Sequence, residues 1–408
     1  MTFITAKRFA IGFLSSLLGY ILFPSPSFAS GALPYCFGAK MCQMGGAGVA
    51  MPLDSTSGNV NPALMANVGR QAAIHPLMIL QDETVDTSRT GLTAGTPLKP
   101  WTGAQTNRMK VYGAAYSGFN YDLNPNWAIG FSTAGGGNNT RYLRSIVSPD
   151  LNAPRRLESA AGLISQIFAY KPNSDQSYGL SLIGGVLRMK NNLTQFPSGM
   201  LTKGANKADY SLGIGTRVGG QWNIQKLSFG FAVNSPVFFQ KLKKYSDVMP
   251  KAPRLPVMIT GGTAWHINKE TDLLFDLEGA LWKSTSSFGK TPPRGQGWKD
   301  VLVYKFGVQH TLIKDLKVRA GYNYGRSPIP NSQVLFSALS EVITVSEHIV
   351  TSGFTYDFTE ALALDLGISY MFPHKITDNG KGVAGPAAAG LRVKARALVI
   401  TTGFNLVY

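Results

Sequence analysis

The side chains that most often carry out catalysis are scattered along this sequence of 408 residues. None of the histidines falls within a Gly-x-Ser-x-Gly motif or beside paired carboxylates. The histidines are His75, His266, His310, His348 and His374. Glycine-rich segments give no nucleotide site either, because Gly213-x-Gly215 lacks the spacing of a dinucleotide turn and Gly289-Lys290-Thr291 lacks the upstream glycine of a phosphate loop. We therefore predict no catalytic residues, no enzyme activity and no cofactor.

The sequence has only two cysteines, Cys36 and Cys42, close to each other near the N-terminus. In an oxidising compartment this spacing favours a small disulfide-bonded loop. A metal site would need two further ligands nearby, and no histidine lies within thirty residues of either cysteine. The sequence thus predicts a disulfide and no metal site.

The first residues predict export. Lys7 and Arg8 precede an apolar run from Phe9 to Phe23, and small residues follow at Ser27 and Ala29. This order is typical of a secretory signal peptide, here residues 1–29. The alternative is an N-terminal membrane anchor, for which the run is short compared with the roughly 20 residues that a spanning helix needs.

The charge is strongly positive, with 39 Lys and Arg against 22 Asp and Glu and a net charge of +17. One interpretation is a set of solvated loops and a polar interior; the other is attraction to anionic lipopolysaccharide or anionic ligands. An exported chain is not expected to bind nucleic acid.

The secondary structure of the rest of the chain is expected to be strands, because apolar and polar side chains alternate with a period of two in segments of about ten residues. In one segment Leu362, Leu364, Leu366, Ile368, Tyr370 and Phe372 share a face, and Ala361, Ala363, Asp365, Gly367 and Ser369 share the other. The same pattern recurs over 210–218, 227–234, 302–309 and 317–324. A soluble β-sandwich could give this alternation too.

Two features favour a membrane barrel over a sandwich. Aromatic residues stand near segment ends, where an interfacial girdle would place them: Tyr121, Trp127, Tyr170, Trp222, Trp265 and Trp282. The chain also ends with Phe404, Leu406 and Tyr408 on one face, a pattern that resembles the C-terminal signature of outer-membrane barrels. Seven longer polar stretches separate the segments. We predict an all-β transmembrane antiparallel barrel of about 14 strands over residues 76–408, in the bacterial outer membrane.

Residues 30–75 do not alternate. They are small and rich in glycine, as in Met44–Asp54 and Asn59–Leu64, and could fill the barrel; a disordered tail is the alternative. The run Gly45-Gly46-Ala47-Gly48-Val49-Ala50, with Asp54 and Asn61-Pro62-Ala63, resembles the N-terminal hatch of the long-chain fatty acid transporter (FadL-type) family. Further matches are Gly297-Trp298-Lys299-Asp300, Arg319-Ala320-Gly321-Tyr322 and Pro328-Ile329-Pro330.

The resemblance implies a barrel plugged by residues 30–75, which takes up a hydrophobic compound from outside and releases it sideways into the membrane. Hatch residues expected to gate passage are Gly45, Gly46, Asn61, Pro62 and Ala63. The expected cargo is a long-chain fatty acid or a related hydrophobic compound, including aromatic hydrocarbons. A general porin and a non-transporting adhesin are the alternatives. Expected partners besides the ligand are lipopolysaccharide, outer-membrane lipid and the barrel assembly machinery, and the expected state is a monomer.

Strand parity gives candidate ligand contacts. Arg217, Lys305, Lys317 and Arg319 would point inward, where a cation could hold a carboxylate head group; a salt-bridged lumen is the alternative. Tyr324 and the loop residues Ile329, Leu335 and Phe336 are candidate entry contacts, because they would otherwise expose apolar surface. Packing of loop on loop would explain them equally well.

Overall fold

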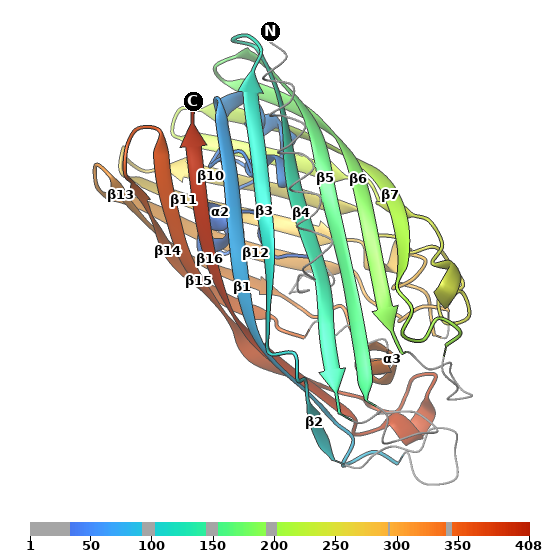
Figure 1. Ribbon diagram of the computed structural model, residues 1–408. Helices are drawn as coiled ribbons and strands as arrows, with labels where there is room; N and C mark the ends of the chain where they lie inside the picture. The colour runs from blue at the N-terminus through green and yellow to red at the C-terminus, as the bar shows by residue number, and fades with distance from the viewer. Residues whose placement is uncertain (1–32, 92–102, 144–153, 193–201, 293, 340–344) are drawn as a thin grey trace.

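The computed structural model describes residues 33–91, 103–143, 154–192, 202–292, 294–339 and 345–408. The predicted signal peptide lies outside these residues. Within them, fourteen long antiparallel strands pair edge to edge, and β16 pairs with β1 to close the barrel (Figure 1), as predicted. The long strands are β1 (Gln71–Asp86), β3 (Val111–Asp122), β4 (Trp127–Tyr142), β5 (Arg155–Asn173), β6 (Gln176–Asn191), β7 (Asp209–Ile224), β8 (Leu227–Asn234), β10 (Met258–His266), β11 (Thr271–Ala280), β12 (Val301–Ile313), β13 (Leu316–Gly325), β14 (His348–Asp357), β15 (Leu362–Thr377) and β16 (Arg392–Val407). Two short strands, β2 (Ala104–Thr106) and β9 (Phe238–Phe239), pair with β1 and β7.

The two ends of the barrel differ. The end that carries the C-terminus has tight turns, such as the one between β5 and β6, and we call it the turn end. The other end, the loop end, carries the longer connections and the helices η3 (Lys243–Tyr245), η4 (Trp282–Ser284), α3 (Val334–Leu339) and η5 (Gly385–Ala388). Short periplasmic turns and longer extracellular loops are typical of outer-membrane barrels.

Alternation sorts the wall into two faces as predicted. On β7, Leu212 and Ile214 are 60% and 72% exposed on the outer face. Ser211, on the inner face of the same strand, is buried. Large apolar side chains are exposed in this way around the barrel, which only a lipid environment makes favourable.

The hatch fills the lumen. It contains α2 (Ala39–Gln43), η1 (Ser57–Asn59) and η2 (Pro62–Asn67), which lie inside the barrel in Figure 1. Met44, Val49 and Leu64 are fully buried. Because β1 begins at Gln71, residues 71–75, which the sequence placed with the hatch, belong to the barrel wall.

One aromatic residue differs from its predicted place in the girdle. Trp282 is fully buried, with its ring centroid 4.9 Å from that of Trp298 and 5.1 Å from that of Phe288. The cause is that β11 ends at Ala280, so Trp282 belongs to the loop-end apolar cluster and not to a lipid-facing strand. In the described part of the chain no helix has the length and apolar character needed to cross a membrane.

Candidate functional site

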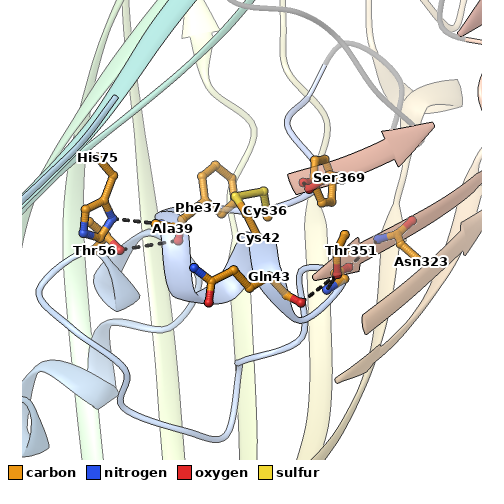
Figure 2. The surroundings of a disulfide bond; sticks show 12 residues. Cys36, Phe37, Ala39, Cys42, Gln43, Thr56, His75, Asn323, Thr351 and Ser369 are labelled. Atoms are coloured by element: carbon orange, nitrogen blue, oxygen red, sulfur yellow. Dashed lines mark hydrogen bonds between the residues drawn. A yellow bond between two sulfur atoms is a disulfide. The ribbon is translucent and has the colours of Figure 1, made fainter. Parts of the chain in front are cut away.

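The start of the hatch is a small disulfide-bonded loop against the barrel wall (Figure 2). Cys36 and Cys42 are joined by a disulfide that ties the residues before α2 to its last turn. The Ala39 N–H donates to His75 Nδ1 on β1 at 2.9 Å. The Phe37 ring meets the Tyr116 ring on β3 edge to face, with centroids 6.1 Å apart. The disulfide loop is therefore held to the β1–β3 side of the barrel.

The end of α2 is held farther around the barrel wall, by β13 and β14. Thr351 Oγ1 donates to the Gln43 carbonyl at 2.8 Å and accepts from the Gly45 N–H at 2.9 Å. Asn323 Nδ2 donates to the Gly45 carbonyl at 2.9 Å, so both backbone polar groups of Gly45 are bound (Figure 2). Gly45 has a φ of 66°, and a Cβ there would lie 2.6 Å from the Tyr322 carbonyl oxygen. Only glycine fits this position.

A buried carboxylate on β11 binds the middle of the hatch. Asp276 Oδ2 accepts from the Gly48 N–H at 2.8 Å and from the Val49 N–H at 2.9 Å. Two convergent backbone donors on one carboxylate oxygen make strong, charge-assisted bonds. We did not predict this role for Asp276 from the sequence, although its position on the lumenal side of an alternating strand is the signal that could have indicated it.

Three of the predicted gating residues of the hatch pack against β6 and β7: Asn61, Pro62 and Ala63. Asn61 caps η2 by accepting from the Ala63 N–H at 3.0 Å, and its Nδ2 donates to the carbonyls of Val49 and Gly220 at 2.8 and 3.0 Å. The amide thus connects two parts of the hatch to the wall. Gly46 also has a positive φ, of 85°, and its N–H donates to the Met41 carbonyl at 3.0 Å. Whether these residues gate passage stays a prediction.

Titratable groups gather where the hatch meets β1 and β15. Asp54, His75 and Asp365 each offer an atom within 4.8 Å of the others, a spacing that a metal ion could use. These side chains are already hydrogen-bonded: His75 accepts from Ala39, Asn405 Nδ2 donates to Asp365 at 2.6 Å, and the Thr56 N–H donates to Asp54 at 2.8 Å. The cluster thus serves as a polar contact between hatch and wall.

The buried surroundings shift the pKa values of two hatch side chains. For Asp54, desolvation favours the neutral acid, but His75, Lys40 and Thr56 together outweigh it and hold its pKa below the usual value. For Tyr35, burial raises the pKa of the phenol despite its 2.6 Å hydrogen bond to Ser369. Asp54 is therefore charged and Tyr35 neutral around neutral pH.

Of the four predicted head-group cations, three are engaged in the barrel. Lys305 forms a buried ion pair with Glu278 at 2.8 Å. Arg319 Nη1 donates to Gln43 at 3.1 Å and its Nε to Gln309 at 2.7 Å. Lys317, which is partly exposed at the turn end, pairs with Asp357 at 3.1 Å. The structure brings none of these three to a cavity wall among the described cavities.

Arg217 differs, because it lines a cavity on the loop side of the hatch. This cavity has an empty volume of about 870 Å³, part of it open to solvent. Its wall is mainly apolar, with Phe37 and Val60 from the hatch and Leu163 and Ile183 from the barrel. Arg217 Nε donates to Asn234 at 2.7 Å and Nη1 to the Gly58 carbonyl at 2.8 Å. The buried Arg217 cation thus faces a largely apolar cavity.

The predicted entry contacts separate into two groups. Tyr324 lies on the outer face of β13, stacked on His348 with ring centroids 4.8 Å apart. Ile329, Leu335 and Phe336 are buried, and the first two belong to the same loop-end cluster as Trp282. Their loop is thus packed as a lid of apolar side chains over the loop end.

Comparison with known proteins agrees with this geometry. The family described as "Outer membrane protein transport protein (OMPP1/FadL/TodX)" matches residues 41–408. The chain belongs to this family. No curated protein sequence matches it.

Solved structures share the fold at low sequence identity. The P. putida toluene transporter TodX is 16% identical with a TM-score of 0.68, and 92% of this chain covers 99% of that one. A Pseudomonas aeruginosa FadL homologue gives 14% and 0.66, and the Ralstonia pickettii toluene transporter TbuX gives 14% and 0.64, with the same coverage. The chain is thus an outer-membrane transport protein and not an enzyme, and by the usual orientation its turn end is periplasmic.

Proposed function

We propose that this protein lets hydrophobic small molecules, long-chain fatty acids first among them, cross the outer membrane by facilitated diffusion. The observation that carries the proposal is an apolar cavity beside the hatch, inside the barrel. Lipopolysaccharide sugars block apolar solutes, and a water-filled pore would not favour them either. An apolar route through a closed barrel avoids both barriers.

Arg217 is the group that favours an acid over a hydrocarbon. Arginine has more N–H donors than the two bonds to Asn234 and Gly58 use, and the cavity is the space that its side chain lines. A carboxylate would bind such a cation by charge-assisted hydrogen bonds while its alkyl chain lies on Val60 and Leu163. The acidic residue of the described cavity wall, Glu278, is neutralised by Lys305.

A sideways exit is proposed where the ladder between β3 and β4 ends. The paired register of β3 with β4 stops at Ser117 and Thr133, whereas β3 pairs with β1 as far as Val111. The next residues of β4, Ala134 to Gly136, line the cavity. Because this ladder is short, the barrel wall beside the cavity is weakly paired between β3 and β4.

Gating by the hatch completes the proposal. Asn61 contacts both Val49 and β7, so that breaking its bonds would release the hatch segment beside the cavity. Pro62, Ala63, Gly45 and Gly46 would set how far that segment moves. Rearrangement of these residues opens the route while the strands stay in place.

Uptake by cells that lack their own transporter tests the head-group role. With Arg217→Gln, uptake of labelled oleate should fall by about tenfold, because a charge-assisted bond to the carboxylate is lost, whereas uptake of neutral toluene should be unchanged. Arg217→Lys, which keeps the charge, should retain part of the oleate uptake.

Lys317→Gln is the matched control, because it removes a cation outside the cavity. Equal loss of oleate and toluene uptake in Arg217→Gln would contradict a head-group role and indicate a displaced hatch. A small aromatic hydrocarbon is the second candidate cargo, favoured by the apolar wall and by the toluene transporters named above. Toluene uptake without oleate uptake by the unmodified protein would favour it.

A further inference from the structure

A row of basic side chains crosses the outer face of three neighbouring strands at the loop end. Arg141 on β4, Arg156 on β5 and Arg188 and Lys190 on β6 have the outward parity of their strands. The same parity carries the exposed side chains Phe168 on β5 and Leu180 and Leu182 on β6. These strands lie side by side in Figure 1. The basic row therefore faces the membrane side of the wall and not the lumen.

The pairing register places like charges together. Arg141 and Arg156 are direct cross-strand partners, and like charges in that position are destabilising unless an anion compensates them. Glu158, the acidic residue of the row, forms ion pairs with Arg156 and with Arg188, the latter at 3.0 Å. It also lies opposite Lys190. Among the described residues, the row thus has four cations and one carboxylate, and it keeps an excess of positive charge.

The height of the row matches an interface. On β6, Arg188 follows the turn-end aromatic residue Tyr178 by ten positions. At about 3.3 Å per residue and a strand tilt of roughly 40°, this separation corresponds to about 25 Å along the membrane normal. That is about the height of the apolar band of outer-membrane barrels, so the cations lie where lipid head groups begin.

We propose that Arg141, Arg156, Arg188 and Lys190 form a binding site for the phosphate groups of lipopolysaccharide in the outer leaflet. Guanidinium groups bind phosphate oxygens in pairs, and the acyl chains of the same lipid would lie on Phe168, Leu180 and Leu182. Glu158 orients two of the arginines. This inference is independent of the proposed cargo, since the site lies on the other face of the wall.

The test is binding of lipid A by the purified barrel in detergent, measured by native mass spectrometry. Arg141→Gln with Arg156→Gln should weaken binding at least about tenfold, because charge-assisted bonds to phosphate are lost. Dephosphorylated lipid A should bind the unmodified protein as weakly as intact lipid A binds the variant. Lys171→Gln with Lys269→Gln, which removes two cations at the turn end, should leave binding unchanged.

Unchanged lipid A binding in the arginine variant, or equal binding of the dephosphorylated lipid, would overturn the proposal. Heat-dependent electrophoretic mobility checks that each variant is a folded barrel. If the double variant does not assemble, Lys190→Gln is measured in its place, and binding equal to that of the unmodified protein then counts against the site. Oleate uptake should be the same in all these variants, whichever cargo the protein carries.

Discussion

At the scale of single residues, the hatch is held by polar side chains that the barrel wall points inward. Asp276, Thr351, Asn323 and Asn120 each bind hatch backbone groups. Backbone donors and acceptors buried without partners cost free energy, and a segment with little regular structure has many of them. The lumenal polar residues satisfy these groups and so stabilise the closed state.

Asp276→Ala should loosen the middle of the hatch without unfolding the barrel. The Gly48 and Val49 N–H groups would lose their acceptor, which should weaken local hatch stability by about 2 kcal/mol. Hydrogen exchange at these two amides should then be roughly 30-fold faster. Asp276→Asn should have a smaller effect, because a neutral oxygen accepts more weakly.

Asp315→Asn, in the turn between β12 and β13, is the control and should leave exchange at Gly48 unchanged. Exchange that is equally slow in Asp276→Ala would mean that the carboxylate does not hold the hatch.

At the scale of elements, the hatch lies against strands whose inward positions are glycine. A Cβ at Gly179 on β6 would lie 2.3 Å from the backbone of Pro62, and one at Gly230 on β8 would lie 2.1 Å from the Val49 carbonyl. These close approaches let irregular backbone reach the wall and use its hydrogen bonds. The glycines therefore form part of the hatch seat.

Gly179→Ala should displace η2 and destabilise the docked hatch by about 1–3 kcal/mol, the usual cost of overpacking. Limited proteolysis within residues 57–67 should accelerate while the barrel keeps its heat-dependent mobility. Gly279→Ala on β11, where the nearest atom to a new Cβ is 3.9 Å away, should behave like the unmodified protein. Equal proteolysis of both variants would contradict the proposed seat.

The strands could be predicted from the sequence because lipid imposes one rule on all of them. Leu212 and Ile214 face outward and Arg217 inward as their alternation requires. The partners of the hatch could not be predicted, since the contact between Asp276 and Gly48 joins residues 228 positions apart. The place of Trp282 was predicted wrongly for a related reason. Nothing in the residue composition around it marks where the strand before it ends. The ion pairs and hydrogen bonds of Lys305, Arg319 and Lys317 likewise depend on neighbours that only the folded barrel brings together.

At the scale of the whole molecule, a closed barrel whose lumen is filled by its own N-terminal segment cannot serve as a wide aqueous pore in this state. Met44, Val49 and Leu64 are buried inside the barrel, and the apolar cluster around Trp282 packs at the loop end. Among the described residues, an apolar cavity lies at Arg217. This arrangement favours hydrophobic cargo over sugars and salts.

The most direct test is uptake of three labelled solutes, oleate, toluene and maltose, by cells that lack their own transporters, with and without this protein. Barrel quantity is matched by heat-dependent mobility. The account predicts faster entry of oleate or toluene and no change for maltose. Faster maltose entry would indicate a general porin, and no change for any of the three would indicate a surface protein without transport; either result would contradict the account.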